Sequence, residues 1–191
     1  MNWFDRLLRR PATQATGSAV ASSEHAPRWR VSRLIPTLLV LLTCVGCDQA
    51  TKALARRTLA PLPPISLWRD LVRFEYAENS GAFLSLGANW PEAARFTFLI
   101  AFSSLALILM LAFALRAHGV DRWQWLAVAL FIGGGMGNLI DRITRAGAVV
   151  DFVSIGVGPL RTGTFNVADV AITGGALLFV IASFRRERTV A

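Results

Sequence analysis

Four apolar segments, each close to the length of a membrane-spanning helix, limit what this chain of 191 residues can fold into. A helix needs roughly 20 mostly apolar residues to cross the hydrocarbon core of a bilayer. Only 17% of the residues are charged, whereas a soluble domain of average composition carries roughly 25%. The sequence therefore predicts a membrane all-α core of four transmembrane helices within one domain, residues 34–184. The apolar segments run about Leu34 to Leu54, Phe96 to Leu115, Trp123 to Ile140 and Val167 to Phe184.

The basic residues predict the orientation of these helices, because cytoplasmic segments of membrane proteins are enriched in Lys and Arg. The chain has 20 Lys and Arg against 12 Asp and Glu. We expect residues 1–33 to form a disordered, Arg-rich cytoplasmic tail and residues 185–191 a basic cytoplasmic end. The loops 56–95 and 143–165 then face outward. Nucleic-acid binding is disfavoured, because the Arg residues form no continuous basic face.

Both outer loops contain a strand pattern. In Leu71–Tyr76, apolar residues alternate with the charged side chains of Arg73 and Glu75, and a period of two is typical of a half-buried strand. The segment Val149–Val153 is similar and precedes the turn formers Gly156, Gly158 and Pro159. We therefore expect a small β-sheet outside the bilayer, resting on its surface.

Ionisable residues at the ends of membrane spans are costly and by default mark function. In the predicted topology they gather at the outer level, whereas the cytoplasmic ends carry only Arg clusters. Asp48 and Lys52 lie four residues apart, on one helical face of the first span. The remaining members are Asn138, Asp141 and Arg142 at the end of the third span, Asp151 in the following loop, and Asn166 and Asp169 at the start of the fourth span.

Such a cluster can perform carboxylate chemistry. The chain has two His and no nearby Ser–His or Cys–His pairing, which disfavours a nucleophilic triad and a zinc site. An ionised Asp can take a proton from water while a protonated Asp donates to a substrate carbonyl. Two carboxyl groups a few ångströms apart share one proton, because like charges so close cannot both ionise. Two Asp residues on different segments meet this need.

Five short motifs occur in order along the chain, and together they resemble the lipoprotein signal peptidase (signal peptidase II) family over residues 34–184. One such motif alone would carry little weight, whereas five in order at sensible spacing are specific. The motifs are Asp48-Gln49-Ala50-Thr51-Lys52, Asn79-Ser80-Gly81-Ala82-Phe83, Gly137-Asn138-Leu139-Ile140-Asp141-Arg142, Val150-Asp151-Phe152 and Phe165-Asn166-Val167-Ala168-Asp169.

The resemblance implies a multi-pass aspartic endopeptidase of the bacterial inner membrane, with four transmembrane helices and a small outer β-cradle. It implies substrates that are prolipoproteins carrying a diacylglyceryl-modified Cys, cut just before that Cys. It implies no metal and no cofactor, and we expect a monomer in contact with membrane lipids. By motif, Asp151 and Asp169 match the catalytic pair; Asn138 and Arg142 match residues of the substrate channel; Asn166 lies beside the second aspartate; Asn79 contacts the peptide; and Asp48, Lys52 and Asp141 support the structure.

Other interpretations of these residues remain open at this point. Asp141 and Arg142 could form a structural ion pair, and Asn79 could be a turn residue. The run Gly133–Gly135 favours helix packing. Two rival functions also stand: a proton-coupled transporter, and a protein anchored by a lipid on Cys47 after cleavage behind Gly46. The polar groups lie at one membrane face and form no chain through the midplane, which disfavours the transporter.

Overall fold

The computed structural model describes residues 28–81, 90–116 and 120–190. It contains four long helices, α2 (Arg28–Thr58), α3 (Glu92–Arg116), α4 (Arg122–Thr144) and α5 (Val167–Val190). All four are long and apolar enough to cross a membrane, which confirms the predicted fold class. Helix α2 begins at Arg28, ahead of the apolar run. The predicted tail before residue 28 and the Ala82-Phe83 end of one motif lie outside the described residues.

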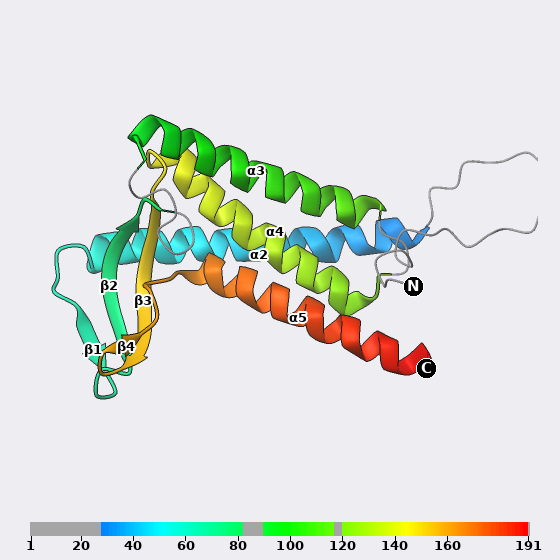
Figure 1. Cartoon of the computed structure of the whole chain (residues 1–191). Coiled ribbons are helices and arrows are strands. Elements are labelled where there is room, and N and C mark those ends of the chain that lie inside the picture. The colour runs from blue at the N-terminus through cyan, green and yellow to red at the C-terminus, as the bar shows by residue number, and fades with distance from the viewer. Residues whose placement is uncertain (1–27, 82–89, 117–119, 191) are drawn as a thin grey trace, which may run out of the picture.

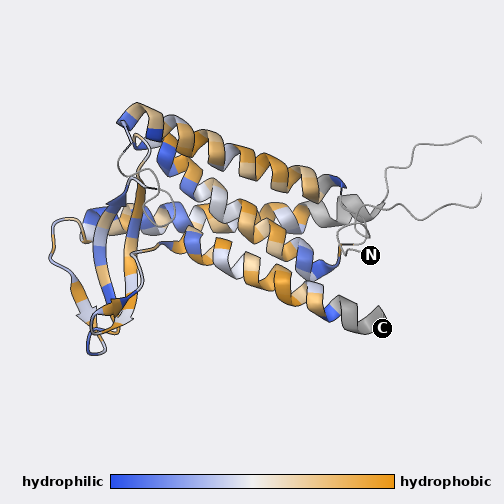
Figure 2. Ribbon diagram, in the orientation of Figure 1, coloured by the Kyte–Doolittle hydropathy of each residue, from blue (hydrophilic) through white to orange (hydrophobic). Residues whose placement is uncertain are grey.

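A small antiparallel sheet lies at one end of the helix bundle, with its strands running across the helix axes (Figure 1). Its strands, in the order in which they pair, are β1 (Ile65–Leu67), β2 (Val72–Asn79), β3 (Val149–Val157) and β4 (Leu160–Arg161). Both predicted strands are therefore confirmed, and β3 continues past the predicted segment. Figure 2 shows hydrophobic colour along the helices and hydrophilic colour at the helix ends that meet the sheet. The polar chemistry of the chain is thus concentrated between the bundle and the sheet.

Helix α4 is the central helix, and its glycine run explains how it contacts the other three. A Cβ at Gly133 would lie 2.8 Å from the Cβ of Cys44 in α2. A Cβ at Gly134 would lie 2.4 Å from the carbonyl oxygen of Ala168 in α5, and one at Gly135 would lie 2.6 Å from Leu107 of α3. Successive helical residues point about 100° apart, so three glycines in a row face three neighbours. The predicted packing role of this run is confirmed.

The packing of α5 on α4 also depends on Gly175, whereas the adjacent Gly174 has open space around it. A Cβ at Gly175 would lie 2.7 Å from the carbonyl oxygen of Ala127 and 3.1 Å from the backbone nitrogen of Phe131. A Cβ at Gly174 would meet nothing within 4 Å. Backbone atoms cannot move aside as flexible side chains do, so only Gly175 is required for the close approach of the two helices.

These two glycines provide a matched test of the packing. We expect Gly175→Ala to lower the free energy of unfolding by about 1–3 kcal/mol, because the new methyl group forces the helix backbones apart. Gly174→Ala should leave it unchanged or raise it by up to about 1 kcal/mol, because alanine favours the helix. Thermal unfolding of the purified protein in detergent checks both. Equal effects of the two substitutions would contradict the close contact.

Candidate active site

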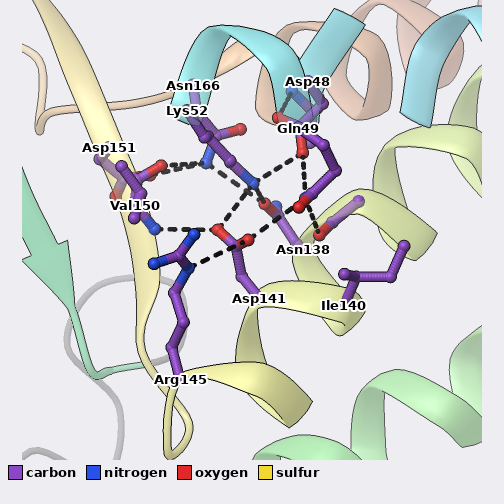
Figure 3. Close-up of polar contacts among 12 residues, drawn as sticks. Asp48, Gln49, Lys52, Asn138, Ile140, Asp141, Arg145, Val150, Asp151 and Asn166 are labelled. Carbon is purple, nitrogen blue, oxygen red and sulfur yellow. Dashed lines mark hydrogen bonds and ion pairs between the residues drawn. The ribbon is translucent and has the colours of Figure 1, made fainter. Parts of the chain in front are cut away.

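All nine residues singled out in the sequence lie at or near the sheet end of the bundle, and eight of them are joined to one another by hydrogen bonds or ion pairs. Figure 3 shows six of the nine: Asp48, Lys52, Asn138, Asp141, Asp151 and Asn166. They come from three helices and two strands. The first span contributes Asp48 and Lys52, α4 contributes Asn138, Asp141 and Arg142, β2 contributes Asn79, β3 contributes Asp151, and the start of α5 contributes Asn166 and Asp169.

A buried lysine forms the centre of this network. The ammonium nitrogen of Lys52 lies 2.8 Å from Oδ2 of Asp48 and 3.1 Å from Oδ2 of Asp141. It also donates to Oδ1 of Asn138 over 2.8 Å. Lys52 and both carboxylates are fully buried. A buried ammonium group is costly unless its N–H groups find acceptors, and here three acceptors from α2 and α4 surround it.

The two acids at this centre also hold other parts of the chain. Oδ1 of Asp48 accepts the backbone N–H of Ala168 in the first turn of α5, over 3.0 Å. Oδ2 of Asp141 accepts the backbone N–H of Val150 in β3, over 3.1 Å. Each carboxylate thus joins the lysine to a segment that carries one of the two candidate catalytic aspartates. This geometry is consistent with the predicted supporting role.

The start of α5 is a capping box made of site residues. Oδ1 of Asn166 accepts the backbone N–H of Asp169 over 3.0 Å, and Oδ2 of Asp169 accepts the backbone N–H of Asn166 over 3.2 Å. This reciprocal pattern satisfies two backbone donors that a helix start otherwise leaves free. Helix α4 begins with a similar box, formed by Asp121 and Gln124. At α5 the cap also fixes the carboxylate of Asp169.

The other aspartate is brought to this helix start by the sheet. Phe165 pairs with β3: its backbone N–H donates to the carbonyl of Val153 over 2.8 Å, and its carbonyl accepts the N–H of Val153 over 3.0 Å. Asn166 follows directly, and its Nδ2 donates to Oδ1 of Asp151 over 2.6 Å. The chain therefore crosses from sheet to helix at the point where the two aspartates approach each other.

A bulge in β2 places Asn79 beside Asp151. The register shifts between Phe74, which lies opposite Val153, and Ala77, which lies opposite Asp151. Opposite residues of an antiparallel pair point to the same face, and a shift by one residue exchanges the faces. Asn79 therefore shares a face with Asp151, and its Nδ2 donates to Oδ2 of Asp151 over 3.1 Å. Its Oδ1 accepts the N–H of Gly81 over 3.0 Å, so Asn79 is also a turn residue.

The environment of Asp151 makes its carboxyl group hard to ionise. Only 2% of the residue is exposed. Burial, and then the neighbouring charge of Asp169, raise the pKa of Asp151 to about 6, although the amides of Asn79 and Asn166 and the charge of Lys52 oppose this rise. Asp169 is partly exposed. The charge of Asp169 acts on Asp151, so the two carboxyl groups are close enough to interact.

Arg142 contacts α3, whereas the other eight residues are hydrogen-bonded or ion-paired to one another. Its Nη1 lies 3.5 Å from the hydroxyl of Ser103 in α3. Its Nε is buried and has no hydrogen-bond partner among the described residues. The alternative of an Asp141–Arg142 ion pair does not occur in the structure: within the described residues, Lys52 and Arg145 are the cations paired with Asp141. Arg142 thus has one N–H donor that no described residue accepts.

Besides Arg145, Ser103 and the backbone of Val150, three participants were not predicted as site residues. The side-chain amide of Gln49 donates to Oδ2 of Asp48, to the carbonyl of Gly137 and to Oδ1 of Asp141, over 3.2, 3.1 and 3.2 Å. Gly137 is required because a Cβ there would lie 2.5 Å from Oδ2 of Asp48. The third is the backbone N–H of Ala168. Gln49 and Gly137 lie inside the motifs quoted above, and membership of those motifs is the one sequence feature that could have indicated their part in the site.

Comparison with known proteins identifies the family of this chain. The sequence model described as signal peptidase (SPase) II matches residues 40–185, which is most of the chain and includes all nine residues predicted for the site. The chain belongs to the signal peptidase II family. The predicted family is therefore confirmed, and with it the interpretation of the chain as a multi-pass membrane protein and a peptidase.

Individual relatives of this family cover most of the chain. The lipoprotein signal peptidase of Mycobacterium tuberculosis is 34% identical over 177 residues, covering 90% of this chain and 81% of the relative. That of Treponema denticola is 37% identical over 139 residues, covering 71% of this chain and 80% of the relative. A solved structure described as a bacterial membrane enzyme superposes with a TM-score of 0.67 at 24% identity, covering 78% of this chain and 92% of its own. A second such structure gives a TM-score of 0.65, covering 80% and 89%. These structures support the fold.

The hydrogen bond from Asn79 to Asp151 leads to a prediction about the signal peptidase II site. This N–H favours the ionised carboxylate, so Asn79→Ala should raise the pKa of Asp151 above about 6. Carbon-13 NMR of aspartate-labelled protein measures the titration. Tyr76→Phe is the control, because the Tyr76 hydroxyl binds Glu78 on the same strand. A pKa of Asp151 that is unchanged or lowered in Asn79→Ala would contradict the contact.

Proposed function

We propose that this chain is an aspartic endopeptidase that removes the signal peptide from prolipoproteins carrying a diacylglyceryl-modified Cys, cleaving just before that Cys. Family membership supports the reaction, and the named relatives are lipoprotein signal peptidases. The observation that carries the proposal is the meeting of Asp151 and Asp169, each held by side-chain amides, at the polar end of a four-helix membrane bundle.

In the proposed mechanism Asp151 holds the shared proton and Asp169 is ionised. Asp151 is the more buried of the two, and burial favours a neutral carboxyl group. Asp169 takes a proton from a water molecule as that water attacks the scissile carbonyl carbon, while Asp151 donates its proton to the carbonyl oxygen. As the intermediate collapses, Asp169 gives its proton to the nitrogen of the leaving peptide and one hydroxyl of the intermediate gives its proton to Asp151, so the pair again holds one proton.

The surrounding residues divide into two proposed groups. The proposed substrate-binding residues are Asn79, Asn138, Arg142 and Asn166. The three amides contact the carboxylates of Asp151 or Asp169. Arg142 has an N–H donor that no described residue accepts. Structural support falls to Asp48, Lys52 and Asp141, whose ion pairs are fully buried. We expect the working enzyme to be a monomer in contact with membrane lipids.

We further propose that the protein resides in the bacterial inner membrane with both termini cytoplasmic and the sheet outside. The support is the Arg-rich N-terminal tail and the basic C-terminal end. In this orientation the carboxylate pair lies at the outer membrane surface, where a lipid-anchored substrate can present its cleavage site.

The rival anchored by a lipid on Cys47 is disfavoured by the structure of α2. Cys47 lies inside this continuous helix, directly before Asp48. Cleavage after Gly46 would remove the part of α2 that includes Cys44, against which Gly133 of α4 packs. The resulting fragment would lose a packed section of its first span.

Conservative substitutions test the catalytic pair. Asp151→Asn and Asp169→Asn should each lower the cleavage rate of a diacylglyceryl-modified prolipoprotein by about 100-fold to 10,000-fold, because each removes a proton-transfer group. The purified enzyme in detergent, with product separated by gel electrophoresis, gives the measurement. Asp70→Asn is the matched control, since Asp70 lies in the turn between β1 and β2 and pairs with Arg73 and Arg161. Wild-type cleavage by either pair variant, as for Asp70→Asn, would remove that residue from the catalytic pair.

The orientation can be tested separately by labelling. In a background of Cys44→Ala and Cys47→Ala, Leu160→Cys should react with a membrane-impermeant maleimide in intact spheroplasts, because Leu160 is 81% exposed on the sheet. A cysteine added after Ala191 should react only after permeabilisation. The opposite pattern would place the sheet in the cytoplasm.

A further inference from the structure

Lys52 makes one contact that a purely structural ion cluster does not need. Two of its three acceptors are the carboxylates of Asp48 and Asp141, which already balance its charge. The third is the amide oxygen of Asn138, at 2.8 Å. Asn138 lies between the lysine and the carboxylate pair, and its other end faces Asp169.

This contact fixes the orientation of the Asn138 amide. Because an ammonium group can only donate, it requires the oxygen of the amide, and the reverse orientation would set N–H groups against N–H groups. Nδ2 of Asn138 must therefore point away from Lys52, and it donates to Oδ1 of Asp169 over 2.8 Å. Lys52 thus determines that Asp169 receives a donor.

The same amide oxygen extends this effect to the second carboxylate. Oδ1 of Asn138 also accepts Nδ2 of Asn166 over 3.2 Å. That Nδ2 group donates to Oδ1 of Asp151 over 2.6 Å. The ammonium group of Lys52 is thus linked to two side-chain amides. The amide of Asn138 donates to Asp169, and the amide of Asn166 donates to Asp151. Figure 3 shows Lys52, Asn138, Asn166 and Asp151.

We propose that Lys52 is a positioning residue of the carboxylate pair, which orients the amides of Asn138 and Asn166 and supplies a fixed positive charge behind Asp151 and Asp169. This inference rests on the proposed function. It gives Lys52 a role in the reaction beyond support of the bundle, although the lysine touches neither carboxylate of the pair.

The charge of Lys52 acts in the same direction as its hydrogen bond. Burial raises the pKa of Asp151, and Lys52 is among the groups that lower it. The charge of Lys52 and its hydrogen bond to Asn138 both favour an ionised carboxylate, so the pair reaches its single-proton state more easily. The charged and polar groups facing Lys52 or the pair are Asp48 and Gln49 from α2, Asn138, Asp141, Arg142 and Arg145 from α4, Asn79 from β2, and Asn166 from the start of α5.

Arg145 offers a matched control for this proposal. Its Nε lies 3.5 Å from Oδ1 of Asp141, so it is a second cation on the same acid. It is partly exposed, and the structure gives it no contact with Asn138. Removal of Arg145 weakens the ion cluster without releasing the amide that holds Asp169.

The test is the pH dependence of cleavage of the lipidated prolipoprotein by purified protein. The variants are Lys52→Met, the double variant Lys52→Met/Asp48→Asn, and Arg145→Gln. The double variant also replaces the carboxylate of Asp48, because the single substitution leaves that carboxylate buried without its cation, which is strongly destabilising. Asp141 retains Arg145 as a partner in both. Thermal unfolding identifies which Lys52 variant is folded at the assay temperature.

We expect the folded variant without Lys52 to lose up to about 100-fold in kcat through misplacement of the pair. Both limbs of its pH profile should move to higher pH, by about half a unit to one unit, because removal of a nearby cation makes each ionisation harder. Arg145→Gln should keep both limbs at the wild-type pH values. A loss of kcat with unmoved limbs in either folded Lys52 variant would overturn the positioning role, as would an equal shift in Arg145→Gln.

Failure of this inference can be distinguished from failure of the proposed function. Asp151→Asn and Asp169→Asn are assayed beside the Lys52 variants. If Asp151→Asn and Asp169→Asn are inactive while the pH profile of the folded Lys52 variant is unmoved, the catalytic pair stands and only the proposed role of Lys52 is wrong. If they cleave normally, the catalytic pair itself is wrong, whatever the Lys52 variants do.

Discussion

The arrangement of this protein depends on the burial of one ammonium group. Lys52 has no exposed surface, and its contacts with Asp48, Asp141 and Asn138 tie α2 to α4. Through Asp48 the same cluster reaches the first turn of α5, and through Asp141 it reaches β3. Replacement of buried ion pairs by apolar groups is often neutral for stability. A cluster of this kind is therefore better explained by the geometry it imposes on the two segments that carry Asp151 and Asp169.

Those two segments place the aspartates by different means. Asp169 closes the capping box of α5, so one of its oxygens satisfies the backbone while the other accepts the amide of Asn138. Asp151 belongs to a strand and receives one amide from each side, from Asn79 and Asn166. A helix cap and a paired strand are both rigid supports, and rigid supports favour precise positioning of reacting groups. The bulge in β2 completes the site by turning Asn79 toward Asp151.

Much of this architecture could be predicted from the sequence, because it follows from local patterns. The apolar runs gave the four spans, the alternation in Leu71–Tyr76 gave β2, and the motifs brought Asp48, Lys52, Asn138, Asp141, Asn166 and Asp169 to one level. The bulge could not be predicted, since a register shift depends on the partner strand. Two further contacts could not be predicted, because they depend on how the helices pack. They are the hydrogen bond that the N–H of Ala168 donates to Asp48 and the bridge that Gln49 makes from α2 to α4. Asn138 was assigned to the substrate channel, and its contact with Lys52 became visible only in three dimensions.

The central claim is that Asp151 and Asp169 share one proton within this network, and infrared difference spectroscopy of the protein in lipid nanodiscs tests it most directly. The protonated-carboxyl band is followed as the pH rises from about 4 to 8, a range that includes the ordinary aspartate value. The account predicts a carboxyl group that loses its proton near the pKa of about 6 found for Asp151, with this step absent in Asp151→Asn and displaced in Asp169→Asn. Two independent carboxyl groups that both titrate near the ordinary value of about 4, each unaffected by substitution of the other, would contradict it.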